Sequence, residues 1–215
     1  MSTREWVVSR LVAAGALAAL ACPSVSVAQD LPHLRGRKVV LLALPSSMAG
    51  NVIDDTQHLA SQIAASLRTA GVRVVVAGVE AQVPLEELAG TANASGPAVT
   101  IGVRSLGSSG KCAAAITPQR VPKPFQPDGP LSKDEFGRVV KQLAASSRAE
   151  VSTTLAKVLA SVVRCCPRKP TESERYVLDA INSPTVLLSL GSSDAAVFLS
   201  HVPALLERWI AMEQE

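Results

Sequence analysis

The chain has 215 residues, of which 47% are hydrophobic and only 3% aromatic, and its formal net charge is +3. This length suits one domain, with a core built mainly of Val, Leu, Ala and Ile. Two Trp and one Tyr are too few for recognition of glycans by platforms of stacked rings. The charge is too small to indicate a nucleic-acid partner, and we expect none.

Residues 1–28 have the pattern of a secretory signal peptide. Arg4 and Arg10 precede an apolar run over residues 11–21, and small residues end the segment. The run is too short to cross a bilayer, so we expect export to the periplasm or the cell exterior and no integral membrane span. The alternative is a lipoprotein anchored at Cys22, since the residues before it loosely resemble a lipoprotein processing box.

After a short N-terminal segment, residues 29–37, the first strand and helix are predicted by their apolar patterns. Residues 38–44 are an apolar run, which is typical of a strand buried on both faces. Leucine and isoleucine then recur every four residues from Leu59, which predicts an amphipathic helix. Asp54 or Asp55 is the expected N-cap, and Gly71 is expected to end the helix.

Three more elements continue the alternation of strands and helices. Residues 73–77 form the second predicted strand, Pro84 opens a short helix, and residues 98–103 form the third strand. This order predicts right-handed crossovers and a parallel sheet. We therefore expect one α/β domain over residues 38–212, with a mainly parallel, twisted sheet flanked by helices.

The second half of the chain has less regular signals. Residues 112–116 are expected to form an edge strand, and residues 117–135, with five prolines, an exposed loop. Ser147 and Glu150 form a capping-box pattern that predicts the start of a helix, whose apolar face begins at Val151.

The last third returns to buried elements. A polar connection over residues 165–174 is followed by a short helical turn or strand at 176–181. Residues 185–190 are a predicted central strand, and the apolar residues from 198 to 210 follow helical spacing. We interpret that last stripe as a core-facing helix surface.

Three cysteines remain after the predicted signal peptide: Cys112, Cys165 and Cys166. In an oxidising compartment we expect one disulfide, which joins Cys112 to Cys165 or to Cys166. No histidine lies near these cysteines in the sequence, so a metal site there is not expected.

Nucleophilic hydrolase chemistry has little support in the sequence. No Gly-x-Ser-x-Gly elbow occurs, and we expect His33, His58 and His201 to be solvent-facing polar residues. Two Gly/Ser turns, residues 107–110 and 191–193, leave an anion or small-molecule binder as a third hypothesis.

The order of elements and the loop residues resemble the secreted zinc-dependent N-acetylmuramoyl-L-alanine amidases, whose catalytic domain is α/β. That family opens with a Leu-Asp-Pro-Gly-His-Gly-Gly-x-Asp loop, which residues 43–51 match with Ser47 at the His position. The carboxylate that would match the ligand Glu is Asp54. The family's third strand ends in Ser-Ile-His-x-Asn, and residues 101–105 place Val103 at that second His.

The last motif is one of the more specific matches to the family. The family has Pro-x-Val-Leu-x-Glu-x-Gly-Phe-x-Ser-Asn, and residues 184–194 match this frame with Ser189 at the position of the catalytic Glu. The family's Ala-Asn pair is matched by Ala92 and Asn93. The resemblance covers residues 38–212.

The resemblance implies a degenerate member of the family that lacks the zinc ligands. A catalytic zinc needs three protein ligands and an open position for water, and a nearby carboxylate takes the proton of that water. The substitutions remove both imidazoles and the base, so we expect no cofactor and no catalysis. The resemblance places the old cleft at Ser47, Asn51, Asp54, Arg104, Ser189 and Asp194.

Two functions therefore remain open at this point. The first is an exported, catalytically inactive amidase-like domain that acts in binding or regulation of peptidoglycan or of an envelope protein. The alternative is an active cell-wall hydrolase that cleaves the amide between N-acetylmuramic acid and L-alanine. It requires His33, His58 or His201 to converge on Asp54 or Asp194.

Overall fold

A five-stranded sheet with the order β2-β1-β3-β5-β4 organises the fold. The computed structural model describes residues 31–44, 52–78, 83–106, 114–123, 129, 132–165 and 170–214. Strands β1 (Lys38–Ala43), β2 (Arg73–Ala77), β3 (Val99–Ser105) and β5 (Thr185–Leu190) are parallel, and the edge strand β4 (Ala114–Pro118) is antiparallel to β5. This is the predicted mainly parallel sheet, and its edge strand ends two positions beyond the predicted residues 112–116.

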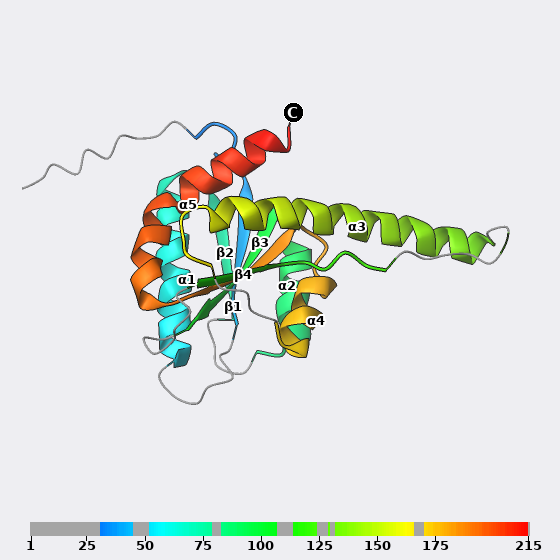
Figure 1. Ribbon diagram of the computed structural model, residues 1–215, viewed down its shortest axis with the longest axis horizontal. Coiled ribbons are helices and arrows are strands. Elements are labelled where there is room, and N and C mark those ends of the chain that lie inside the picture. Colours follow the sequence, from blue (N-terminus) through cyan, green and yellow to red (C-terminus); the bar gives the residue numbers. More distant parts are fainter. Residues whose placement is uncertain are drawn as a thin grey trace, which may run out of the picture.

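Helices cover both faces of the sheet and give three layers (Figure 1). Helices α1 (Val52–Thr69) and α5 (Ser192–Met212) lie on one face with the second half of α3 (Lys133–Ala160). Helices α2 (Leu85–Ser95) and α4 (Glu172–Ala180) lie on the other face. The first half of α3 projects beyond the layers (Figure 1).

Alternation along β1 shows why its sequence is apolar at every position after Lys38. Val39 and Leu41 belong to the core under α1 and α5, whereas Val40 and Leu42 belong to the core under α2 and α4. Successive side chains of a strand point to opposite faces, so a strand with helices on both sides buries both sets. All four side chains are 0% exposed. The same two-sided burial holds β3 and β5 in the centre of the sheet.

Several predicted boundaries were wrong. Helix α1 begins at Val52, so Asp54 and Asp55 lie in its first turn and neither is the N-cap. Strand β3 continues through Arg104 and Ser105, two positions beyond its predicted end. The predicted Pro-rich loop starts too early, because residues 117–119 are a strand end and a buried glutamine.

Helix α3 begins far upstream of the predicted start. Its capping box is formed by Ser132 and Glu135, whereas Ser147 lies in the middle of the helix. The apolar residues of the first half, Phe136, Val140 and Leu143, are 49–64% exposed, and none of them belongs to the two core clusters. A burial pattern therefore revealed only the second half of the helix.

Helix α4 resolves the ambiguity over residues 176–181. It begins at Glu172 behind a capping box of Thr171 and Glu174, so the polar connection before it is shorter than predicted. Glu174 was expected at the end of the polar connection, and it lies in the first turn of α4, only 7% exposed. This burial matters for the site described below.

Helix α5 docks on α1 around an internal proline. Pro203 has no N–H, so the carbonyl of Leu199 lacks its helical donor. The hydroxyl of Ser66 on α1 donates to that carbonyl oxygen at 3.0 Å. By length and composition α5 is the one described helix that could cross a membrane, but it buries Phe198 and Leu206 in the core. We interpret it as a core helix.

Candidate functional site at the carboxyl edge of the sheet

The strand order reverses its direction between β1 and β3, which makes this the topological switch point of the sheet. The chain passes from β1 outward to β2 and then returns to β3 on the other side of β1, so the connections diverge there. Ligands of open α/β sheets bind at such a point, beyond the carboxyl ends of the strands. Ser105 ends β3 and Leu190 ends β5 at this edge. Residues 45–51, which connect β1 to α1, lie outside the described residues.

A pocket of about 270 Å³ opens at this edge between α1 and the start of α5. Its polar lining residues are Asp55, His58, Gln62, Ser105 and Ser192. The first three share one face of α1, because residues three and four apart on a helix are neighbours. Nε2 of Gln62 lies 2.9 Å from Nε2 of His58, and the amide can only donate.

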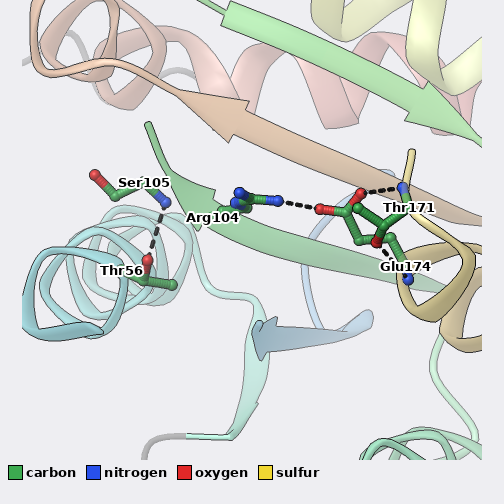
Figure 2. A network of polar contacts seen from close by, with 5 residues as sticks. All are labelled: Thr56, Arg104, Ser105, Thr171 and Glu174. Carbon is green, nitrogen blue, oxygen red and sulfur yellow. Dashed lines mark hydrogen bonds and ion pairs between the residues drawn. The ribbon is translucent and has the colours of Figure 1, made fainter. Parts of the chain in front are cut away.

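A buried hydrogen bond fixes the start of α1 against the end of β3. The backbone N–H of Ser105 donates to the Thr56 hydroxyl at 3.0 Å (Figure 2). Thr56 is 2% exposed, so water competes little for this bond. The contact holds Asp55 and His58, the neighbours of Thr56 on α1, at the rim of the pocket.

Arg104 forms an ion pair with Glu174 on the opposite face of the sheet. Both side chains are 8% exposed, and the contact joins β3 to α4 (Figure 2). One Glu174 oxygen accepts from Arg104, and the other accepts from the backbone N–H of Thr171 at 2.7 Å. The Thr171 hydroxyl accepts from the Glu174 N–H at 3.2 Å. One carboxylate thus caps α4 and neutralises a buried guanidinium.

Strand alternation separates two positions that the family resemblance treats together. Val103 points into the core under α1 and is 0% exposed. Arg104 points to the other face, as Figure 2 shows for its contact with α4. The register partner of Arg104 is Ser189, which is 1% exposed. The arginine therefore lies beside the position where the family has its catalytic glutamate.

The predicted cleft residues are only partly brought together. Arg104 and Ser189 are neighbours across two strands. Asp194 lies in the first turn of α5, at the same edge of the sheet. Asp54 lies in the first turn of α1, at a position whose side chain is not described. Ser47 and Asn51 lie outside the described residues.

The three histidines are exposed, as predicted, and they occupy different places. The backbone N–H of His33 donates to Glu207, and its ring contacts Gln214. The ring of His201 contacts Val197 and Ser200 within α5. Of the three, only His58 lines the pocket at the carboxyl edge. The place of His58 in that pocket was not predictable from the sequence, because it depends on where α1 begins.

The ion pair was also missed, although both partners left a signal. Arg104 is the one charged residue in a strand that is buried at every position, and a charge in such a place needs a partner. Thr171 and Glu174 have capping-box spacing. The contact between Arg104 and Glu174 spans 70 positions, so the sequence alone does not pair these two residues.

The predicted disulfide lies partly outside the described residues. The backbone of Cys165 forms an isolated β-bridge with that of Ala114, so Cys165 lies beside the start of β4. Cys112 is two positions before Ala114 in the chain, and both Cys112 and Cys166 lie outside the described residues. The disulfide remains a prediction.

The described residues do not fit a catalytic zinc. Within the described ranges no three His, Cys, Asp or Glu side chains gather closely enough to hold a metal. At the positions that the resemblance assigns to a ligand and the base, Val103 offers an isopropyl group and Ser189 a neutral hydroxyl. Zinc sites in proteins use imidazole, thiolate and carboxylate ligands, and neither group is one of these. Arg104 adds a permanent positive charge beside Ser189.

No protein-family model matches the chain, and no curated protein matches it. Among solved structures, it is similar to the N-acetylmuramyl-L-alanine amidase Ami1 from Mycobacterium smegmatis, with 14% identity, a TM-score of 0.48, and 83% of this chain and 99% of that chain covered. An N-acetylmuramoyl-L-alanine amidase from Clostridium difficile 630 gives 16% identity, a TM-score of 0.49, and 83% and 96% coverage. Such scores do not transfer a function, so the functional argument rests on this chain's own residues.

Proposed function

We propose that this protein is an exported amidase-like domain that binds peptidoglycan and does not cleave it. The motif frame of residues 184–194 and the order of elements support the amidase-like part of the proposal. The observation that supports the absence of catalysis is the buried Arg104–Glu174 pair beside Ser189. The predicted signal peptide, residues 1–28, supports export.

The residues around Ser189 offer neither a metal ligand nor a general base. Glu174 already neutralises Arg104 and caps α4, so it is not available as a metal ligand. Ser189 cannot take a proton from a bound water as a carboxylate does.

The lining of the pocket suits a peptide better than a sugar ring. Its polar groups are one carboxylate, one imidazole, one amide and two hydroxyls, and its lining includes no Phe, Tyr or Trp side chain. Such groups exchange hydrogen bonds with amides, carboxylates and ammonium groups. We therefore propose that the peptide part of peptidoglycan contacts Asp55 and His58, with an envelope protein as the alternative ligand at the same edge.

Sedimentation with insoluble peptidoglycan tests binding, and zinc content with peptide release tests catalysis. We expect the protein to co-sediment, to hold no stoichiometric zinc and to release no peptide. His58→Ala should weaken co-sedimentation, whereas His201→Ala, an exposed histidine outside the pocket, should not. Failure to co-sediment would refute peptidoglycan as the ligand.

The active hydrolase stays as a second candidate because Asp55 and His58 share one pocket. Stoichiometric zinc together with released peptide would establish it and refute the inactive assignment. Loss of both in His58→Ala would then identify His58 as a ligand that the motif alignment had missed.

Export has its own test. N-terminal sequencing of the protein from the producing cell should begin at Gln29. A lipid-modified Cys22 at the new N-terminus would establish the lipoprotein alternative, and an intact Met1 would refute export through this segment.

A further inference from the structure

A second pocket, of about 470 Å³, lies at the opposite, amino edge of the sheet. It is formed between α3 and the end of α5, where residues just before β1, β3 and β5 complete the wall. Its volume lies in the range of small-molecule sites, about 300–1,000 Å³. Ligands of open α/β sheets bind at the other edge, so the fold itself does not account for this pocket.

Two buried donors without partners lie in its lining. Trp209 is 3% exposed, and its indole Nε1 has no hydrogen-bond partner. Nε of Arg148, on α3, is buried and also lacks a partner. Leaving one buried donor unsatisfied costs about 1–3 kcal/mol, so two such donors lining one pocket need an explanation. A ligand that accepts hydrogen bonds supplies one.

The charges of the pocket select an anion. Arg37 and Arg148 both line it, and neither guanidinium forms an ion pair with a described residue. The Nε of Arg37 donates to the His33 carbonyl at 3.2 Å, which leaves its terminal nitrogens for a ligand. The opposing charge in the lining is Glu213, which is exposed. Guanidinium groups bind carboxylates through two parallel hydrogen bonds.

The remaining lining requires that the anion have an apolar body. Val151 and Ile210 contribute branched side chains, and Ala98 and Pro184 close the wall at the strand ends. We propose that this pocket is a binding site for a small organic carboxylate, whose acid group meets Arg37 and Arg148 and whose apolar part contacts Trp209 and Ile210. The site is separate from the carboxyl edge and does not depend on the function proposed there.

Tryptophan fluorescence tests the site directly. The chain has two tryptophans, Trp6 and Trp209, so Trp6→Phe in the full chain leaves Trp209 as the only reporter. The probes are 3-phenylpropanoate, its uncharged analogue 3-phenylpropanol, and propanoate, which lacks the ring. We expect a saturable change with 3-phenylpropanoate, with a dissociation constant in the millimolar range or tighter, and none with the other two at the same concentrations. No saturation with 3-phenylpropanoate, or an equal response to the alcohol, would overturn the proposal.

Matched variants separate a binding role from a structural one. Arg148→Met should weaken binding about tenfold or more, because a hydrogen bond to a charged group is lost. Arg120→Met is the control, since Arg120 is exposed and does not line this pocket. Arg148→Met should also leave the urea midpoint unchanged or raise it, because it removes a buried unpaired donor. A lowered midpoint with unchanged binding would show that Arg148 is structural and would refute its assignment.

The carboxyl edge provides the last control. His58→Ala, which should weaken peptidoglycan binding, should leave the Trp209 response unchanged. If His58→Ala abolished that response as well, the two pockets would not be independent and the proposal of a separate site would fail.

Discussion

Removal of one charge from the Arg104–Glu174 pair should destabilise the protein strongly. Glu174→Gln keeps the shape of the side chain and its ability to cap α4, since glutamine also serves in a capping box. It leaves the guanidinium of Arg104 buried without a counter-charge. Both side chains are 8% exposed, so the pair belongs with buried ion pairs, for which loss of one partner costs about 3–5 kcal/mol. We expect the lower end, about 3 kcal/mol, because the amide oxygen still accepts a hydrogen bond.

Urea denaturation followed by circular dichroism measures this loss. The midpoint should fall while the slope stays constant, since the same surface is exposed on unfolding. For a chain of this size each kcal/mol corresponds to about 2–4 °C in melting temperature, so a shift of about 6–12 °C is expected. Arg104→Met should cost about as much as Glu174→Gln, whereas the double variant should cost less than either single variant, because neither charge is then left alone.

Glu135 provides a matched control. It occupies the same capping-box position in α3. Hydrogen bonds from Ser132, chiefly from its hydroxyl and then from its backbone N–H, hold the pKa of the Glu135 carboxyl below its ordinary value. No buried cation depends on Glu135, so Glu135→Gln should leave the urea midpoint nearly unchanged. If Glu174→Gln behaved like Glu135→Gln, or if the double variant lost the sum of the single losses, the ion pair would not have the stabilising role that we assign to it.

Three further predictions concern the fold. Gly78→Ala should destabilise the protein by more than about 2 kcal/mol in urea denaturation, because φ is +80° and the new Cβ would lie 2.4 Å from a backbone oxygen. Gly90 in α2 has open space around it, so Gly90→Ala should stabilise the protein by about 0.5–1 kcal/mol in the same assay. Ser66→Ala should lower the free energy of unfolding by about 1–3 kcal/mol, because the Leu199 carbonyl loses its donor. In the background of Pro203→Ala a backbone N–H can donate to that carbonyl, so Ser66→Ala should cost about zero there. Equal costs in both backgrounds would refute the role of the Ser66 hydroxyl. Mass spectrometry without reduction should find Cys112 in a disulfide with one of the two adjacent cysteines after α3, and a fully alkylated Cys112 would refute the bond.

The sequence predicted the apolar strands most reliably. Residues 185–190 were placed at the bounds of β5, which is buried at every position, and residues 73–77 at those of β2, a partly buried edge strand. Both have a continuous apolar pattern between turn residues. Starts of helices were less predictable. A Ser-x-x-Glu pattern occurs both at Ser132 and at Ser147, and only tertiary contacts decide which one begins a helix.

The candidate site was predictable only as a set of positions. The motif frame placed Arg104 and Ser189 at the carboxyl edge, and the register confirms that they are neighbours. The frame could not show that Val103 faces the core, because that depends on which residue of β3 begins the alternation. Nor could it find Glu174, which reaches the site from a helix that the sequence left ambiguous.

The buried pair is a specific structural feature of the carboxyl edge. A polar edge with no further role would need no buried charge. Here the charged side chain of Arg104 enters the space between β3 and α4, where an apolar residue of similar size would be about as stable. The pair therefore contributes more to position than to net stability, because it fixes the first turn of α4 against the end of β3. A binding surface needs such a fixed edge, whereas a remnant of a lost reaction does not.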